Sequence, residues 1–349
     1  MDSHRELNNI KFIHKMIKKY TLNLNGLTVF TEAATNAYKY TPIIAAMSGA
    51  KTFAFSRDNE YGTRLEAINQ VSELEESIFL QNKITYIYQR QKQYLEVSDI
   101  ITNTGNVRPI DAKIIDYLKP TAVIPLMYDV HEIRKEDIDI DACRKKGIAV
   151  LGTNEGKDGC DLLNTIILKT LKAIFNCGYS AYKDEILLIS SDFIGDNISQ
   201  GFSKLGISHD RIYSYNNNDH NDFILDNLDR YDIVIIADNS DPQYIIGDEG
   251  FLKIERILSG NKDIKIIHMY GNIDWVKMQK AKLNLFPSII KPFGYGSFIA
   301  DYLGAKPVIE LMTAGLKVGE SLARKRLAGL SVEQSENEVV KEGLGVKID

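Results

Sequence analysis

Polar side chains follow several predicted strands in the first half of the chain and could bind a small molecule. The segment Asn103–Arg108 offers amide, hydroxyl and guanidinium donors, and its glycine lets the backbone approach a ligand closely. These donors suit an anionic or polyhydroxylated molecule. Because ligands of parallel α/β sheets bind at the carboxyl ends of the strands, the predicted substrate-binding residues are Glu32, Thr35, Asn36, Arg57, Asp58, Asn103, Thr104, Asn106, Arg108, Asn154 and Glu155.

The same residues have a structural interpretation, which the sequence leaves open. The turn after Asn103 would be capped by its own side chains, with Arg108 paired to Asp111 or Glu32. Arg57 and Asp58 would form an ion pair at a strand end. Asn154 or Asp158 would cap the long helix that follows.

Four residues are predicted to carry proton transfer: His131, Glu132, His268 and Tyr270. An unperturbed imidazole titrates near neutrality, and Glu132 or Asp129 could orient that of His131. His268 comes at the end of an apolar run. The alternatives are a solvated His131 and a buried, hydrogen-bonded His268. No His, Cys, Asp or Glu spacing indicates a metal site, so no metal is predicted.

The segment Glu185–Gly206 has the outline of a dinucleotide-binding turn: an apolar run, a tight turn and the start of an amphipathic helix. At the three glycine positions of the fingerprint G-x-G-x-x-G, this chain has Ser190, Asp192 and Gly195. The predicted cofactor-binding residues are Ser190, Ser191, Asp192, Gly195 and Asp238.

A carboxylate at the second fingerprint position opposes cofactor binding. It would face the pyrophosphate, and like charges at about 4 Å and an effective dielectric near 20 cost about 4 kcal/mol. NAD or NADP is therefore a doubtful cofactor, and Asp192 as the N-cap of the following helix is the favoured interpretation.

The elements that must position these residues alternate between strand-like and helical patterns. Strands separated by helices of this length predict βαβ units and parallel sheets. Helical patterns are expected over residues 34–48, 64–81, 109–118, 157–175, 308–327 and 331–341. The expected strands are Leu27–Thr31, Lys51–Ser56, Ile84–Tyr88, Ile100–Thr102, Ala122–Met127, Ile148–Leu151, Ile186–Ser190, Arg211–Tyr215, Tyr231–Ala237, Ile264–Met269 and Ser288–Lys291.

The order of Asp137–Val150, a long helix and then Glu185–Gly206 resembles the D-2-hydroxyacid dehydrogenases and the formate dehydrogenases. Residues 31–68 look like the opening of S-adenosylhomocysteine hydrolase. The resemblance implies an α/β protein with two doubly wound parallel-sheet domains and a cleft between them. A discontinuous flavodoxin-like substrate domain (1–155 plus 308–349) would precede a Rossmann-like domain (156–307) that includes the connecting helix.

The chain departs from these dehydrogenases where their catalytic residues would lie. Their substrate-binding arginine has no counterpart in Ile267–Asp274, and Phe293 follows Pro292 where their proton-transferring histidine would stand. A phenyl ring cannot carry a proton. The resemblance therefore implies the scaffold without its usual acid–base groups.

Composition narrows the function classes. The 349 residues predict two domains, and a net charge of −5 disfavours nucleic-acid and membrane partners. Unpaired cysteines and the absence of a signal-like run predict a cytoplasmic protein, expected as a homodimer.

Two functions remain open from the sequence. The first is a dehydrogenase-like enzyme that acts on a small polar or anionic metabolite, with NAD or NADP in an altered pose. The second is a cofactor-free member of the same fold, which does non-redox chemistry or senses a ligand.

Overall fold

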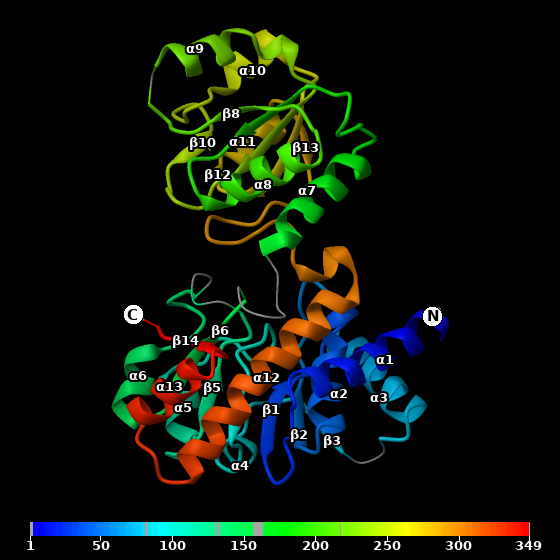
Figure 1. Ribbon diagram of the computed structural model, residues 1–349, viewed down its shortest axis with the longest axis vertical. Helices are drawn as coiled ribbons and strands as arrows, with labels where there is room; N and C mark the ends of the chain where they lie inside the picture. Colours follow the sequence, from blue (N-terminus) through cyan, green and yellow to red (C-terminus); the bar gives the residue numbers. More distant parts are fainter. Residues whose placement is uncertain are drawn as a thin grey trace. The chain divides into compact units, whose positions relative to one another are not determined.

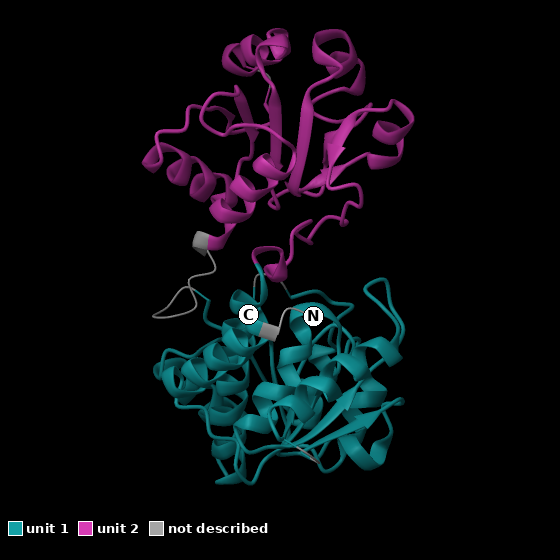
Figure 2. Cartoon of the chain, turned by 90° about the vertical axis from the view of Figure 1, so that its right-hand side faces the viewer, with its two compact units in different colours: residues 1–161, 304–349 teal, residues 162–303 magenta. Residues whose placement is uncertain are grey.

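The computed structural model describes residues 3–80, 83–128, 130, 133–155, 163–216 and 218–348. The chain divides into two compact units (Figure 2). Unit 1 consists of Met1–Asp161 together with Gly304–Asp349, and unit 2 of Leu162–Leu303. Predicted sites at His131, Glu132, Asp129 and Asp158 lie outside the described residues.

Unit 1 is built on a sheet of seven strands in the order β14-β6-β5-β4-β1-β2-β3 (Figure 1). All neighbours pair in parallel except β14, which is antiparallel to β6. The strands are β1 (Thr28–Glu32), β2 (Lys51–Phe55), β3 (Ile84–Ile87), β4 (Ile100–Ile101), β5 (Val123–Pro125), β6 (Ala149–Thr153) and β14 (Gly345–Val346).

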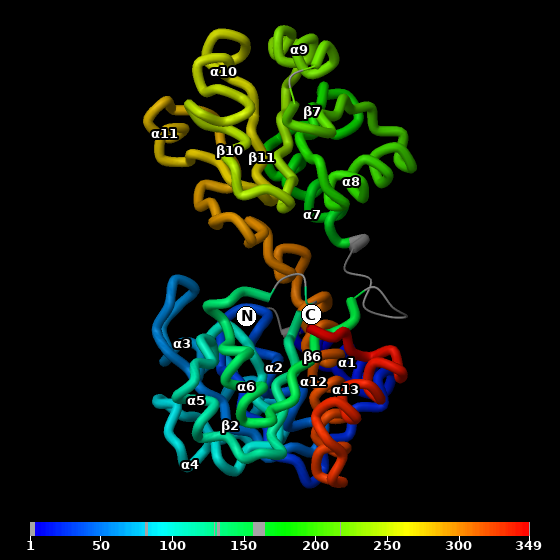
Figure 3. The backbone as a smooth tube through the Cα atoms, turned by 90° about the vertical axis from the view of Figure 1, so that its left-hand side faces the viewer, coloured from blue at the N-terminus to red at the C-terminus, as the bar shows by residue number. Residues whose placement is uncertain are grey.

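Helices cover both faces of this sheet. On one face, an apolar cluster joins the strands to α4, α5 and α6. On the other, α12 packs on β5 and β6 and beside α1 and α2, as Figures 1 and 3 show. The helices are α1 (Ser3–Lys19), the 3-10 helix η1 (Asn36–Lys39), α2 (Tyr40–Met47), α3 (Arg64–Ser77), α4 (Lys92–Leu95), α5 (Ala112–Tyr117), α6 (Ile140–Lys146), α12 (Ala305–Leu327) and α13 (Val332–Lys341).

Two glycines let α12 lie directly on the sheet. A Cβ added at Gly319 would lie 2.9 Å from Cγ2 of Ile100 and from Cγ of Pro125. A Cβ at Gly315 would lie 2.7 Å from Sδ of Met127. Although glycine lowers helix propensity, here it permits the close packing that buries the apolar face of α12.

Unit 2 has a parallel sheet of five strands in the order β13-β11-β9-β7-β8. Ile186 and Leu188 of β7 join the cluster under α7 and α8. Leu187 and Ile189 join the cluster under α9, α10 and α11. Burial on both faces explains why the strands read as continuous apolar runs.

The elements of unit 2 have the following bounds. The strands are β7 (Ile186–Ile189), β8 (Asp210–Ile212), β9 (Ile233–Ala237), β11 (Lys265–Tyr270) and β13 (Asn284–Phe286), with a separate pair, β10 (Tyr244–Ile246) and β12 (Asn272–Ile273). The helices are α7 (Leu163–Asn176), α8 (Phe193–Lys204), α9 (Asp219–Asp226), η3 (Leu228–Arg230), α10 (Ile254–Asn261), α11 (Trp275–Lys280) and η4 (Ala300–Leu303).

The predicted class, α/β with two doubly wound parallel sheets, is confirmed. The strand orders refine it. They are the reverse of the expected assignment. Unit 1, expected to be flavodoxin-like, has the order 3-2-1-4-5-6 of the nucleotide-binding fold, because β4 lies beside β1. Unit 2, expected to be Rossmann-like, has the order 2-1-3-4-5 typical of flavodoxin, because β9 lies beside β7.

The strand predicted at Ser288–Lys291 is wrong. The last strand of unit 2 is β13, which ends at Phe286. Pro287, which follows, has no N–H to donate to a sheet ladder, and Ile289 is exposed.

Candidate functional site

The carboxyl ends of β1 and β4 form the point of unit 1 where the strand order reverses. β2 and β3 lie on one side of β1, and β4, β5 and β6 on the other. A doubly wound sheet binds ligands at such a point because the following loops separate there. Glu32 is the last residue of β1, and Asn103–Arg108 follow β4, so the structure brings these predicted residues together.

Glu32 is a buried carboxyl group at this edge, with an exposed fraction of 3%. Burial raises the pKa of Glu32 from 4.5 to about 7, although the Asn106 N–H, Arg108 and Arg57 oppose the rise. The backbone N–H of Asn106 donates to Oε2 of Glu32 over 2.7 Å. No described residue donates a hydrogen bond to Oε1. A carboxyl with this pKa can both take up and release a proton at neutral pH.

Gly105, in the loop after β4, lies close to Glu32. A Cβ at the exposed Gly105 would lie 3.7 Å from Oε2 of Glu32 and 3.9 Å from Nη2 of Arg108. The exposed Arg57 donates through Nη2 to the carbonyl oxygen of Gly105 over 3.1 Å. The charges of Arg108 and Arg57 lie near enough to Glu32 to oppose the rise in its pKa.

Two buried polar groups follow β4 and β2, the strands that neighbour β1. Oδ1 of Asn103 accepts the N–H of Met127 over 2.7 Å, but its Nδ2 has no partner among the described residues, although Asn103 is fully buried. Oγ of Ser56, after β2, also lacks a partner there. Buried polar groups without partners in the protein commonly bind water or a ligand.

Other side chains fix the loop in place. Asn106 donates through Nδ2 to the carbonyl of Ala33 over 2.9 Å and accepts from Asn59 over 2.8 Å. Thr104 shares a hydrogen bond of 3.2 Å with Thr102. Asn106 and Thr104 are thus held by the protein rather than directed at a ligand.

Arg108 and Asp58 form ion pairs with other partners than the sequence suggested. Arg108 pairs with Asp137 over 2.6 Å, not with Asp111 or Glu32. Asp58 pairs with Arg64 rather than with Arg57, which lies beside Gly105. No sequence pattern identified Asp137 as a partner, because it lies 29 residues beyond Arg108.

Thr35 and Asn36 lie toward α3. Thr35 donates to the carbonyl of Tyr61 over 3.0 Å, and the backbone N–H of Asn36 donates to Gln70 over 3.2 Å. These hydrogen bonds connect the start of η1 to neighbouring segments of unit 1.

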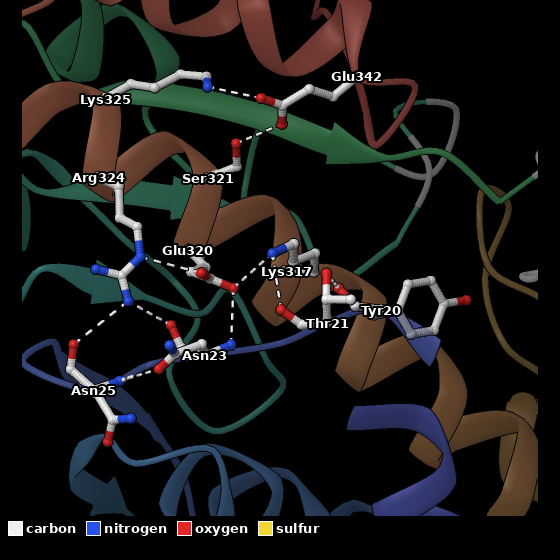
Figure 4. A network of polar contacts seen from close by, with 10 residues as sticks. All are labelled: Tyr20, Thr21, Asn23, Asn25, Lys317, Glu320, Ser321, Arg324, Lys325 and Glu342. Carbon is white, nitrogen blue, oxygen red and sulfur yellow. Dashed lines mark hydrogen bonds and ion pairs between the residues drawn. The ribbon is translucent and has the colours of Figure 1, made fainter. Parts of the chain in front are cut away.

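Asn154 lines a separate hollow in unit 1, of about 640 Å³, between α12 and the ends of α1, β6 and α13. Its side chain donates to the carbonyl oxygen of Gly343 over 3.3 Å. Charged side chains on the wall pair with one another, as Figure 4 shows for Glu320 with Lys317 and Arg324. Glu155, the next residue and also a predicted substrate-binding residue, takes part in a polar or electrostatic interaction as well.

In unit 2, the predicted cofactor residues gather at the start of α8. Asp192 is the N-cap of α8, as the sequence predicted: its Oδ1 accepts from the N–H groups of Ile194 (2.9 Å) and Gly195 (3.4 Å). Its Oδ2 accepts the N–H of Asn239 over 2.7 Å. Burial and the Asp238 charge raise the pKa of Asp192 despite these hydrogen bonds.

Asp238, after β9, is the second carboxylate at this place. It accepts from the N–H and hydroxyl of Ser191, from both groups of Ser240, and from the hydroxyl of Tyr215. Burial alone would raise the pKa of Asp238, but these hydrogen bonds outweigh it and hold the pKa below its usual range.

Gly195 is required by packing between α8 and β7. A Cβ there would lie 2.2 Å from Oγ and 2.3 Å from Cβ of Ser190, which is fully buried. The third glycine of the dinucleotide fingerprint has this packing role. Its presence is therefore explained without a cofactor.

His268 in β11 is fully buried and uses both ring nitrogens within unit 2. Nε2 lies 2.9 Å from the carbonyl oxygen of Gly271, which can only accept, so this nitrogen carries the proton. Nδ1, 2.7 Å from Oγ of Ser297, then accepts the serine hydroxyl. Burial lowers the pKa of His268 to about 4. His268 is therefore the buried, hydrogen-bonded histidine that the sequence left open as the alternative to a proton carrier. It has no role in the function proposed below.

Tyr270, the other predicted proton carrier of unit 2, is half-buried at the end of β11. Its ring lies against the loop at Gly296, where a Cβ would be 2.8 Å from ring carbons. In the part of the chain that the structure describes, no three His, Cys, Asp or Glu side chains form a metal-binding group. No helix there is long and apolar enough to cross a membrane.

Comparisons with known proteins place the chain beside solved structures only, since no family model and no curated protein matches it. It is similar to a dipicolinate synthase chain of Bacillus halodurans, at 11% identity and a TM-score of 0.49 over 87% of this chain and 99% of that one. It is also similar to NAD+-bound 3-phosphoglycerate dehydrogenase of Entamoeba histolytica, at 11% identity and a TM-score of 0.45 over 87% of this chain and 96% of that one.

A third solved structure is the NAD-dependent formate dehydrogenase of Staphylococcus aureus in complex with NAD, at 10% identity and a TM-score of 0.46 over 83% of this chain and 93% of that one. The resemblance of residues 31–68 to S-adenosylhomocysteine hydrolase stays a prediction. The solved structures similar to this chain thus include a 3-phosphoglycerate dehydrogenase and a formate dehydrogenase.

Proposed function

We propose that the chain is an enzyme with a dehydrogenase-like scaffold that acts on a small polar or anionic metabolite at the carboxyl ends of β1 and β4. Glu32 takes up or releases the proton in the reaction. The observation that carries the proposal is the burial of Glu32, with its pKa near 7, at the strand-order reversal of unit 1.

The neighbours of Glu32 define the class of ligand. Arg57 supplies a guanidinium group whose ordinary charge attracts an anion, and its hydrogen bond to the carbonyl of Gly105 holds it beside the loop. Nδ2 of Asn103 and Oγ of Ser56 supply donors that the described residues do not use. A carboxylate or a phosphate ester with a nearby hydroxyl would satisfy these groups together.

A thermal-shift screen tests this function. The probes are short 2-hydroxy and 2-oxo carboxylates, sugar phosphates and adenosine at millimolar concentration, applied to wild type, Glu32→Gln and Arg57→Ala. Glu73→Gln on the exposed side of α3 is the matched control. We expect a carboxylate or phosphate to raise the melting temperature of wild type and the control, with the effect reduced in both site variants. Stabilisation that is equal in all four proteins would contradict the proposal.

A second candidate function is that of a dehydrogenase-like enzyme that also binds a nicotinamide cofactor. The feature that favours it is Gly195, which keeps the third glycine of the dinucleotide fingerprint. The carboxylates of Asp192 and Asp238 at the same place weigh against it.

A further inference from the structure

The N–H groups at the carboxyl ends of β7 and β9 are occupied by the protein's own carboxylates. Asp192 accepts from the N–H groups of Ile194, Gly195 and Asn239. Asp238 accepts from those of Ser191 and Ser240. In a dinucleotide-binding domain, N–H groups of this kind bind the pyrophosphate, because the start of the helix favours negative charge.

A phosphate anion would meet unfavourable charge as well as missing donors. The pKa of Asp238 lies below its usual range, so this carboxylate is charged at neutral pH. Asp192 faces it closely enough for the Asp238 charge to raise its pKa. A dianionic pyrophosphate would have to displace one carboxylate and approach the other.

The guanidinium group beside the turn, that of Arg211, does not compensate for this charge. Its Nη1 pairs with Asp196 over 2.7 Å. Its Nε and Nη2 donate to the carbonyl oxygens of Ser190 and Asp192. Arg211, which is buried, therefore points its donors at groups of the protein.

We infer that Asp192 is a built-in anion that replaces the cofactor's pyrophosphate at the start of α8, so that unit 2 binds neither NAD nor NADP there. The residues of this turn do not fit the cofactor, although Gly195 matches its fingerprint. Gly195→Val would not test this, because any side chain at Gly195 clashes with Ser190.

Pyrophosphate and NAD are suitable probes, measured by calorimetric titration of the full-length protein. Asp192→Ser removes the charge and keeps a hydroxyl that can cap α8. Asp192→Asn removes the charge and keeps an acceptor oxygen, so it provides a folded variant if the serine variant fails. Asp219→Asn is the matched control, since it removes an exposed carboxylate from the first turn of another helix of unit 2, α9, without freeing the N–H groups of Ile194 and Gly195.

We expect no pyrophosphate or NAD binding to wild type or Asp219→Asn at millimolar concentration. Asp192→Ser should bind pyrophosphate at least about tenfold more tightly than wild type, because it removes like-charge repulsion and frees donors. Amide resonances of Ile194 and Gly195 should shift in the variant. Pyrophosphate or NAD binding by wild type that shifts these resonances would overturn the inference. So would folded Asp192 variants that bind no more tightly than wild type.

Discussion

The backbone N–H of Asn106 donates to Oε2 of Glu32 over 2.7 Å, and this contact closes the loop after β4 over the end of β1. The hydrogen bond favours the charged form of a carboxyl group that burial keeps largely neutral. Since the two effects oppose each other, the pKa of Glu32 falls near 7 rather than higher. The loop after β4 thus positions the Glu32 carboxyl group and lowers its pKa against the effect of burial.

Glu32 should make stability fall as pH rises. The folded protein keeps the Glu32 proton up to about pH 7, whereas the unfolded chain loses it near 4.5. The folded state therefore binds more protons in this window, and up to about 3 kcal/mol of stability is lost between pH 4.5 and 7.5. Urea unfolding of wild type and Glu32→Gln at both pH values measures the difference.

Glu73→Gln provides the control because the Glu73 side chain is exposed on α3. Its pH profile should follow that of wild type. A Glu32→Gln profile with the same slope as wild type would mean that Glu32 ionises near its ordinary pKa and cannot carry the proton at neutral pH.

Much of the fold could be predicted from the sequence because its strands are buried on both faces. Ile186–Ile189 and Ile233–Ala237 are continuous apolar runs, and turn-forming residues end them. The site could be predicted in part, since Glu32 and Asn103 follow strands whose carboxyl ends must share one edge. A strand predicted after Pro287 was wrong because the apolar residues there pair with no strand.

The partners of the site residues could not be predicted in the same way. Asp137, which pairs with Arg108, and Asn59, which holds Asn106, belong to segments without a periodic pattern. Their positions depend on packing between distant segments. The burial of Glu32 has the same origin, so the sequence identified the residue and not its pKa.

Gly195→Ala should destabilise unit 2 through a clash with Ser190. Because the added Cβ would lie 2.2 Å from Oγ of Ser190, we expect a loss of about 1–3 kcal/mol. Ser190→Gly removes the clashing atoms, so the double variant should lose at least about 1 kcal/mol less than the sum of the single losses. Urea unfolding of the four proteins gives this coupling. Additive losses would show that Ser190 is not what limits Gly195.

His268 should make stability fall as pH decreases, the opposite of Glu32. The unfolded chain takes up a proton on this imidazole near pH 6.5, whereas the folded protein does so only near 4. Up to about 3 kcal/mol of stability is therefore lost as pH falls through this window. His268→Gln should remove this slope, while His14→Gln on the exposed face of α1 should keep it. An imidazole resonance of His268 that titrates near 6.5 would contradict the prediction.

Glu320 connects α12 to the segment after α1 (Figure 4). We expect its removal to lower the free energy of unfolding more than the removal of a more exposed carboxylate on the same helix. The Glu320 side chain is 7% exposed and accepts from the N–H of Asn23 (3.0 Å), from Lys317 (2.9 Å) and from Arg324 (3.1 Å). Glu320→Ala leaves the half-buried ammonium group of Lys317 without its carboxylate and the Asn23 N–H without an acceptor. We expect a loss of about 2–4 kcal/mol in urea unfolding.

Glu310→Ala on the same helix is the matched comparison for Glu320. Glu310 pairs with Lys19 over 2.7 Å, but the two side chains are 24% and 35% exposed. Water and salt screen such a pair, so its removal should cost less than about 1 kcal/mol and depend on ionic strength. The loss in Glu320→Ala should change little with salt, because the Glu320 carboxylate is only 7% exposed and the Lys317 side chain 17%. Equal losses in the two variants would show that the Glu320 network contributes no more than a surface ion pair.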